Sequence, residues 1–300
     1  MPRTASDPGS TTVETRPGSG SDASVTPSAL GAVVLGATFH YLGPSFAVLL
    51  FVHVDAVGVA WLRLASAALV FAAWRRPWRV LRDAPPHDRR AMLALGAVLA
   101  GMNASFYLAL DRAPLATVAS IEFLGVVALA AYGVRSRRNS LALALVVGGI
   151  ALLTQVSLAG GTAGLLWAAA NCIGFVLYVV LGHRISGPGG VDRLSVAVVV
   201  GAVVATPFGI AQASPAFGHP LWLWWGVGVG VCSTVIPYVA DQWAMARLPR
   251  ASYALMLALL PVTATLCGLV ILGQVPGHQE VAGIGLVGAA VALHRPREAS

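Results

Sequence analysis

Apolar stretches long enough to cross a membrane recur along this 300-residue chain, and they limit its fold more than any other feature. A hydrocarbon core of about 30 Å requires about 20 helical residues, and most of the stretches reach that length. The gaps between them are too short for a soluble domain, so each backbone amide must bond within its own helix. The ten stretches are 29–51, 56–74, 91–110, 114–133, 140–158, 161–182, 194–211, 221–240, 251–272 and 276–293.

The arginines are distributed on one side of this pattern. Every arginine except Arg63 and Arg112 lies in a terminal tail or in an even-numbered gap between stretches. The largest group occupies 75–90, and the chain contains no lysine. Because loops rich in Arg and Lys stay in the cytoplasm, we expect both termini there and an even number of spans.

Composition excludes several classes of protein. Hydrophobic residues form 57% of the chain and charged residues 10%, which excludes an ordinary soluble domain. The net charge of +7 does not indicate a nucleic-acid partner, because the arginines lie in short clusters beside the spans, where anionic lipid attracts them. Cys172, Cys232 and Cys267 fall inside spans without metal or disulfide spacing. We therefore expect no metal site and no cofactor.

The chain divides into four segments. Residues 1–27 are mostly Ser, Thr, Pro and Gly, and they lack a signal-peptide pattern. We expect a disordered cytoplasmic tail there. Residues 28–158 and 159–294 contain five spans each, and residues 295–300 form a cytoplasmic C-terminal tail.

A short repeat relates the two halves at a constant offset of 135 residues. Between 109–119 and 244–254 five positions are identical without a gap, including an Arg-x-Pro in the turn after the third span of each half. Since each half has an odd number of spans, the second is inverted, with Arg112 outside and Arg247 in the cytoplasm. We predict an all-α integral membrane fold with ten transmembrane helices in two inverted five-helix repeats. Alternating-access transporters have this architecture.

Two ionisable residues, Arg63 and Glu122, lie near the middle of their spans. Each costs about 2.5–3.5 kcal/mol at a helix centre, so both side chains should face the interior of the bundle. In a functional interpretation Glu122 binds a proton or an ammonium group and Arg63 anchors a carboxylate. The alternatives are a buried ion pair, or an Arg63 side chain that extends to the headgroups.

The eighth span carries small and polar residues on one face. Gly226, Gly230, Ser233, Pro237 and Asp241 fall within about 80° of one another. The two glycines allow a neighbouring helix to approach closely, and Pro237 frees carbonyls that need another partner. Asp241 lies near the cytoplasmic end, where it is either a solvated carboxylate or part of a gate.

Other spans carry similar polar faces, each of which is typical of interhelical hydrogen bonds as well as of ligand contacts. We add their polar residues to the candidate substrate or proton path, and we expect Pro44, Pro237 and Pro261 to kink their helices. The candidates are Glu122, Arg63, His40, Asn103, Tyr107, Asn171, Tyr178, Ser233 and Asp241.

Over residues 29–294 the chain resembles the drug/metabolite transporter superfamily of ten-helix EamA-type carriers. Residues 120–125, Ser-Ile-Glu-Phe-Leu-Gly, and 233–238, Ser-Thr-Val-Ile-Pro-Tyr, are similar to motifs of its threonine/homoserine exporter branch. Arg63 matches an arginine frequent in the second helix of such carriers. The resemblance implies a multi-pass carrier of the bacterial inner membrane.

The chain departs from the pattern of that branch at four positions. Asp241 stands where the branch has Glu, and Val126 replaces a Pro. Leu260 and Gln274 stand where Glu is common, so two acidic groups are missing. The substrate and the coupling ion therefore need not follow the branch.

These observations favour a secondary active transporter that exports a small amphoteric metabolite, such as an amino acid, in exchange for protons. Drug efflux is an alternative within the same superfamily. A membrane enzyme or a non-transporting scaffold is an alternative of another class, although the histidines show no metal-ligand spacing. The expected partners are the lipid bilayer, a small-molecule substrate, protons and, for the oligomeric state, a homodimer.

Overall fold

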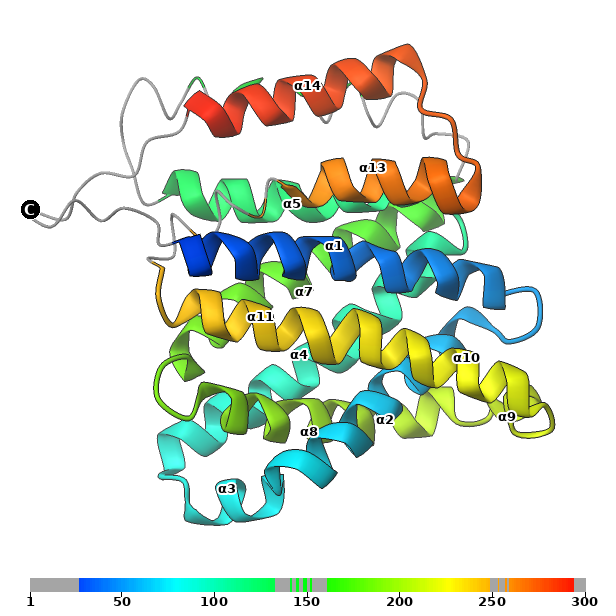
Figure 1. The fold of residues 1–300 in the computed structure, drawn as a ribbon. Helices are drawn as coiled ribbons and strands as arrows, with labels where there is room; N and C mark the ends of the chain where they lie inside the picture. Colours follow the sequence, from blue (N-terminus) through cyan, green and yellow to red (C-terminus); the bar gives the residue numbers. More distant parts are fainter. Residues whose placement is uncertain are drawn as a thin grey trace, which may run out of the picture.

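The structure is a computed structural model that describes residues 27–132, 161–248 and 259–293, together with isolated positions between these ranges. Every regular element in the described residues is helical, and the long helices lie side by side in one bundle (Figure 1). The elements of the first half are α1 (Pro27–Leu50), α2 (Ala56–Arg75), α3 (Pro77–Asp83), α4 (Pro86–Leu110) and α5 (Leu115–Tyr132). Those of the second half are α7 (Gly161–Ile185), α8 (Gly190–Gly209), α9 (Ser214–Phe217), α10 (Pro220–Gly230), the π-helical turn η2 (Val231–Val235), α11 (Ile236–Met245), α13 (Leu259–Leu272) and α14 (His278–Leu293).

Five helical segments of the described residues are long and apolar enough to cross a membrane. They are α2, α4, α7, α8 and the continuous segment Pro220–Met245. Shorter apolar helices occur at Leu35–Leu50, Leu115–Gly125 and Thr263–Leu272. The prediction of an all-α membrane protein is confirmed. The fifth predicted span, 140–158, and both predicted tails lie mostly or wholly outside the described residues, and the number of ten spans stays a prediction.

Two gaps that sequence analysis treated as simple links contain short helices. Asp55 begins α2, and its side chain accepts a hydrogen bond of 2.9 Å from the backbone N–H of Val57. Arg76 ends α2 in the left-handed conformation, with φ of 52°, and Pro77 then begins α3 because proline is compatible with a first helical turn. The second short helix, α9, precedes α10.

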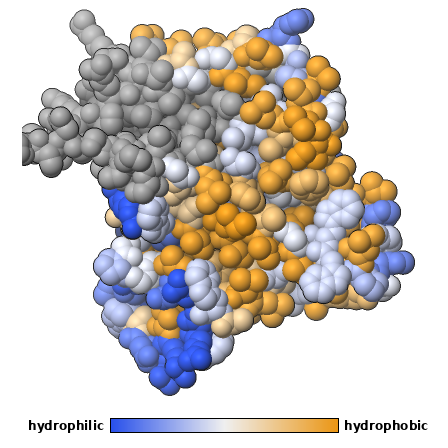
Figure 2. Space-filling model, in the orientation of Figure 1, coloured by the Kyte–Doolittle hydropathy of each residue, from blue (hydrophilic) through white to orange (hydrophobic). Residues whose placement is uncertain are grey.

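The outer surface is apolar, and the bundle interior is closely packed. Leu69, Trp224 and Val270 are 72%, 72% and 79% exposed, as expected for side chains that face lipid. Figure 2 shows a hydrophobic band across this face, with hydrophilic residues concentrated at the end that carries α3. Inside, a Cβ added at Gly230 would lie 2.6 Å from the Arg63 carbonyl oxygen, so α10 and α2 approach as closely as the glycine face predicted.

The two Arg-x-Pro turns lie at opposite ends of the bundle. Arg112 packs beside Gly164 in the first turn of α7, where a Cβ on the glycine would lie 3.1 Å from the arginine Cβ. Arg247 lines a cavity with residues 187–192, which follow the end of α7. These two positions are at opposite ends of α7, which has 25 residues and is therefore about 37 Å long. Figure 1 shows α11 ending at the left of the bundle.

The same two turns share a hydrogen-bond pattern at the offset of the repeat. The backbone N–H groups of Arg112 and Arg247 donate to Ala109 and Ala244, both at 3.0 Å. Each arginine also donates through Nη1 to the carbonyl four residues earlier, at 2.9 Å in Leu108 and 3.0 Å in Trp243. The local sequence match therefore corresponds to a local structural match.

Candidate functional site

Glu122 is a buried carboxylate in the middle of the bundle. Its side chain extends from α5 toward α1 and is 2% exposed. The Tyr41 hydroxyl donates a hydrogen bond of 2.6 Å to its Oε2, and His40 Nε2 lies 4.0 Å from its Oε1. A carboxylate in a dry interior needs such donors, and α1 and α5 both pack against α13.

Arg63 is buried as well, and its guanidinium binds the π-helical turn η2. Its side chain is 3% exposed. Its Nη2 donates to the Ser233 carbonyl oxygen at 2.6 Å and its Nε to Thr234 Oγ1 at 2.8 Å. Pro237 has no N–H to offer the carbonyl four residues before it, and that carbonyl belongs to Ser233. The expected freed carbonyl is thus present, and the guanidinium is its partner.

Neither alternative interpretation of Arg63 matches this geometry. Within the described residues no carboxylate oxygen lies within 4.0 Å of its guanidinium nitrogens. At 3% exposure the side chain does not extend to the headgroups. The Tyr107 ring lies below the guanidinium, 5.5 Å from Cζ to the ring centroid. A buried guanidinium and a buried carboxyl therefore lie in one site without forming an ion pair.

A small cavity connects the two groups. Its volume of about 10 Å³, for the centres of water-sized spheres, is room for about one water molecule. Side chains from α1, α2, α4, α5, α7 and α11 line it: His40, Arg63, Met102, Asn103, Phe106, Glu122, Asn171 and Tyr238. The structure thus brings five of the predicted site residues to one place.

Several polar atoms around this cavity have no protein partner in the described part of the chain. They are Asn103 Oδ1, both amide atoms of Asn171, and the hydroxyls of Tyr107 and Tyr238. All four side chains are at most 2% exposed. A buried polar group without a hydrogen bond costs about 1–3 kcal/mol, so this cluster is suited to bind a polar ligand.

Three predicted residues, Ser233, Pro44 and Pro261, do not line this cavity. The Ser233 hydroxyl donates to the Val229 carbonyl oxygen at 2.6 Å, so its side chain is bonded within its own helix. Pro261 is the third described residue of α13, and the kink expected there stays a prediction. Pro44 lies inside α1.

Asp241 and Tyr178 form a second buried pair away from Glu122. The Tyr178 hydroxyl donates to Asp241 Oδ2 at 2.8 Å. Asp241 is 5% exposed, so a solvated carboxylate, one of the two alternatives, is wrong. Its Oδ1 would lie 3.3 Å from a Cβ added at Gly36 of α1, which shows how tightly the carboxylate packs against that helix.

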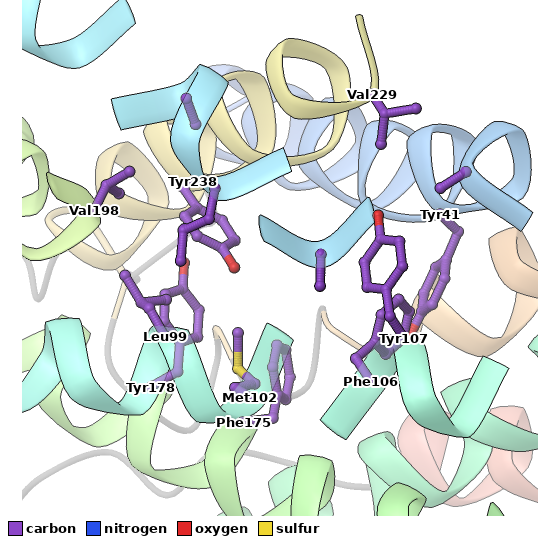
Figure 3. Packing of buried hydrophobic residues seen from close by; sticks show 14 of the residues in the cluster. Tyr41, Leu99, Met102, Phe106, Tyr107, Phe175, Tyr178, Val198, Val229 and Tyr238 are labelled. Atoms are coloured by element: carbon purple, nitrogen blue, oxygen red, sulfur yellow. The ribbon is translucent and has the colours of Figure 1, made fainter. Parts of the chain in front are cut away.

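The aromatic side chains of the core form two clusters, one around Phe106 and one around Tyr178, and Phe175 lies between them (Figure 3). Tyr41 and Tyr107 flank Phe106, at centroid distances of 6.4 and 5.7 Å. Phe175 and Tyr238 flank Tyr178, at 5.7 and 5.2 Å.

Sequence analysis missed Tyr41, Thr234 and Tyr238 as site residues. Tyr41 is next to His40 but points in another direction around the helix, and its partner is 81 residues away in the chain. Thr234 and Tyr238 belong to the motif at 233–238, which was used only to identify the resemblance. That motif could have identified Thr234 and Tyr238 as site residues.

The two missing acidic groups are replaced by residues with structural contacts. Gln274 Oε1 accepts a hydrogen bond of 3.2 Å from the backbone N–H of Leu115, at the start of α5. Leu260 is 1% exposed and lies in the core. Neither lines the cavity beside Glu122.

Comparison with known proteins places this chain in a family. Residues 162–294 match the EamA-like transporter family. The threonine/homoserine exporter RhtA of Salmonella typhimurium is 32% identical over 257 residues, which cover 83% of this chain and 85% of that protein. RhtA of Escherichia coli K12 is 31% identical over 259 residues, with coverages of 83% and 84%. A solved crystal structure that is 21% identical has the same fold, with a TM-score of 0.57 over 88% of this chain and 96% of that one.

The relatives and the helical architecture agree with the resemblance carried by the motifs around Glu122 and Ser233. The likeness to RhtA extends over most of both chains. The chain therefore belongs to the EamA-like transporter family of the drug/metabolite transporter superfamily and is a multi-pass membrane protein.

Proposed function

We propose that this protein is a secondary active transporter of the bacterial inner membrane that exports a small amino acid in exchange for protons. The observation that carries the proposal is the cavity between Arg63 and Glu122. It offers a cation, a carboxyl group and free amide and hydroxyl groups to a ligand. The relatives named threonine/homoserine exporters favour an amino acid with a hydroxyl side chain.

The chemistry of the cavity suits a zwitterion. An amino-acid carboxylate would bind the guanidinium of Arg63, whose planar N–H groups match two carboxylate oxygens. The substrate ammonium would bind Glu122. The amides of Asn103 and Asn171 and the Tyr238 hydroxyl would satisfy the remaining donors and acceptors of the substrate, including a side-chain hydroxyl.

Transport would be coupled to protons because a proton and the substrate ammonium compete for the Glu122 carboxylate. When Glu122 carries a proton it is neutral and holds the substrate ammonium weakly. When the proton leaves, the carboxylate binds the ammonium, because a buried charge needs a counter-charge. Proton and substrate therefore occupy Glu122 in turn, which is the condition for exchange.

Release to either side requires the helices to move. The cavity has room for about one water molecule, far less than an amino acid needs, so binding must separate the helices that line it. The π-helical turn η2 and Pro237 interrupt the regular hydrogen bonding next to Arg63 and offer a place for such bending. We further propose two repeats of opposite orientation, 28–158 and 159–294, with both termini in the cytoplasm.

Reconstituted vesicles test this function. Purified protein in liposomes is supplied with labelled threonine, homoserine and unrelated amino acids, and uptake is followed with an imposed pH gradient and again after an ionophore collapses it. We expect accumulation of one or a few small amino acids, lost without the gradient. Accumulation that ignores the gradient would contradict proton exchange. Transport of hydrophobic cations in place of amino acids would contradict the substrate class.

A further inference from the structure

Two arginines mark a site on the outside of the bundle. Arg75, at the end of α2, and Arg247, after α11, line one cavity of about 550 Å³ with residues 187–192. Each guanidinium lies over a tryptophan ring: Arg75 Cζ is 3.9 Å from the centroid of Trp74, and Arg247 Cζ is 3.5 Å from that of Trp243. Arginine stacked on tryptophan at the end of a span is typical of the membrane interface.

An apolar groove adjoins this cavity. It has a volume of about 520 Å³ and runs between the start of α1 and α11. Leu35, Val239 and Trp74 contribute to its walls, and Trp243 lines both the groove and the arginine cavity. Leu35, Trp74 and Trp243 are 48%, 51% and 37% exposed. An open apolar groove in a transmembrane bundle is a place for an acyl chain.

The charges at the end of the groove favour an anion. Asp192 is the carboxylate of the cavity and lies 3.4 Å from Arg75 Nη1. Two guanidinium groups and one carboxylate leave an excess of one positive charge. Arg75 Nε is buried and has no hydrogen-bond partner among the described residues.

We infer that the Arg75–Arg247 cavity and the apolar groove beside it form a binding site for an anionic phospholipid. The phosphate lies between the two guanidinium groups, and one acyl chain lies along the groove past Trp74 and Trp243. By the distribution of the arginines, this lipid belongs to the cytoplasmic leaflet. The site is separate from the cavity at Glu122, and its test does not use transport.

Native mass spectrometry of the protein in detergent micelles measures this binding. The probes are dioleoyl phosphatidylglycerol and, as the neutral comparison, dioleoyl phosphatidylcholine. We expect one phosphatidylglycerol to bind more tightly than phosphatidylcholine. Arg75→Gln and Arg247→Gln should each weaken it about fivefold, and the double variant about 25-fold. Arg79→Gln, an exposed arginine on α3 outside both cavities, is the matched control and should bind as the wild type does.

A variant that fills the groove tests the acyl chain. Gly31 lines the groove and a Cβ added there meets nothing within 4 Å, so Gly31→Phe adds a ring at the groove without a clash at its Cβ. It should abolish binding of dioleoyl phosphatidylglycerol while leaving that of the dihexanoyl form. Equal binding of phosphatidylcholine, an unaffected double arginine variant, or displacement by millimolar inorganic phosphate would each overturn the lipid site.

Discussion

The two buried carboxylates of this bundle, Glu122 and Asp241, are alike in burial and in having a tyrosine donor, but the rest of their surroundings differ. Both are at most 5% exposed, and each accepts a hydrogen bond from a buried tyrosine, Tyr41 at 2.6 Å and Tyr178 at 2.8 Å. Glu122 then faces a cavity that also contains Arg63 and free amide groups. Asp241 packs against the backbone of Gly36.

This difference shows that burial alone does not identify a transport residue. A carboxylate that packs closely against a neighbouring helix is suited to hold helices together. A carboxylate that shares a cavity with a cation it does not pair with can exchange its partners. We therefore propose that Glu122 couples transport to protons and that Asp241 holds helices together, and each of the following variants tests one side of this comparison.

Replacing Glu122 should have the largest effect. Glu122→Gln keeps the shape of the side chain and can still accept the Tyr41 hydrogen bond, but it cannot exchange a proton. We expect gradient-driven transport to fall to the level of empty vesicles while helical content by circular dichroism is unchanged. Gradient-driven transport at the wild-type rate would remove Glu122 from the mechanism.

Replacing Arg63 should have the second largest effect. Arg63→Ala removes the anchor for the substrate carboxylate and leaves the Ser233 carbonyl without its donor. Because charged hydrogen bonds contribute about 1.5–3 kcal/mol, apparent substrate affinity should fall at least about tenfold. Substrate titration in vesicles measures it. Arg63→Lys retains the charge and should lose less, and equal loss in both variants would argue against a charge contact.

Gly230→Ala should strain the contact that places Arg63. The added Cβ would lie 2.6 Å from the Arg63 carbonyl oxygen, and overpacking of this kind costs about 1–3 kcal/mol. We expect a lower free energy of unfolding in micelles and weaker transport. The matched control is Gly228→Ala, whose Cβ meets nothing within 4 Å. Equal stability of the two variants would show that the close approach of α2 and α10 is not required.

Tyr178→Phe tests the second carboxylate. It removes the donor to Asp241 Oδ2, and the loss should destabilise the protein by about 1.5–3 kcal/mol. Unfolding in micelles measures that loss, and vesicle assays should still show gradient-driven transport. Loss of coupling at unchanged stability would contradict the assignment of Asp241 to helix contact.

Gly36→Ala should have the smallest effect. Its Cβ would meet Asp241 Oδ1 at 3.3 Å and the Ala240 Cβ at 3.5 Å, so small shifts of a few tenths of an ångström accommodate it. We expect a stability change below about 1 kcal/mol and normal transport. A large loss of transport in this variant would mean that α1 and α11 must slide past each other at Asp241.

Features that depend on a local sequence pattern could be predicted, whereas contacts between residues far apart in the chain could not. The spans follow from apolar length, and the α2–α10 contact follows from Gly226 and Gly230. Pro237 predicts a free carbonyl at Ser233, but Arg63, which binds that carbonyl, lies 170 residues away in the chain. No local pattern connects two such positions, because only the packing of the helices brings them together.

The same reason explains the missed residues of the site. Tyr41 looks like a core aromatic, and only the position of Glu122 on another helix gives it a role. The short helices α3 and α9 were missed because they lie in gaps defined by charge and turn residues, where span length carries no information. Burial of Asp241 near a helix end was likewise decided by neighbouring helices.

Substrate-evoked proton flux in vesicles tests the central claim most directly. Vesicles with an internal pH-sensitive dye, and no imposed gradient, receive the transported amino acid outside, and the change in internal pH is recorded for wild type, Glu122→Gln and Asp241→Asn. The account predicts a pH change with wild type and Asp241→Asn and none with Glu122→Gln. A normal signal from Glu122→Gln, or its loss only in Asp241→Asn, would contradict it.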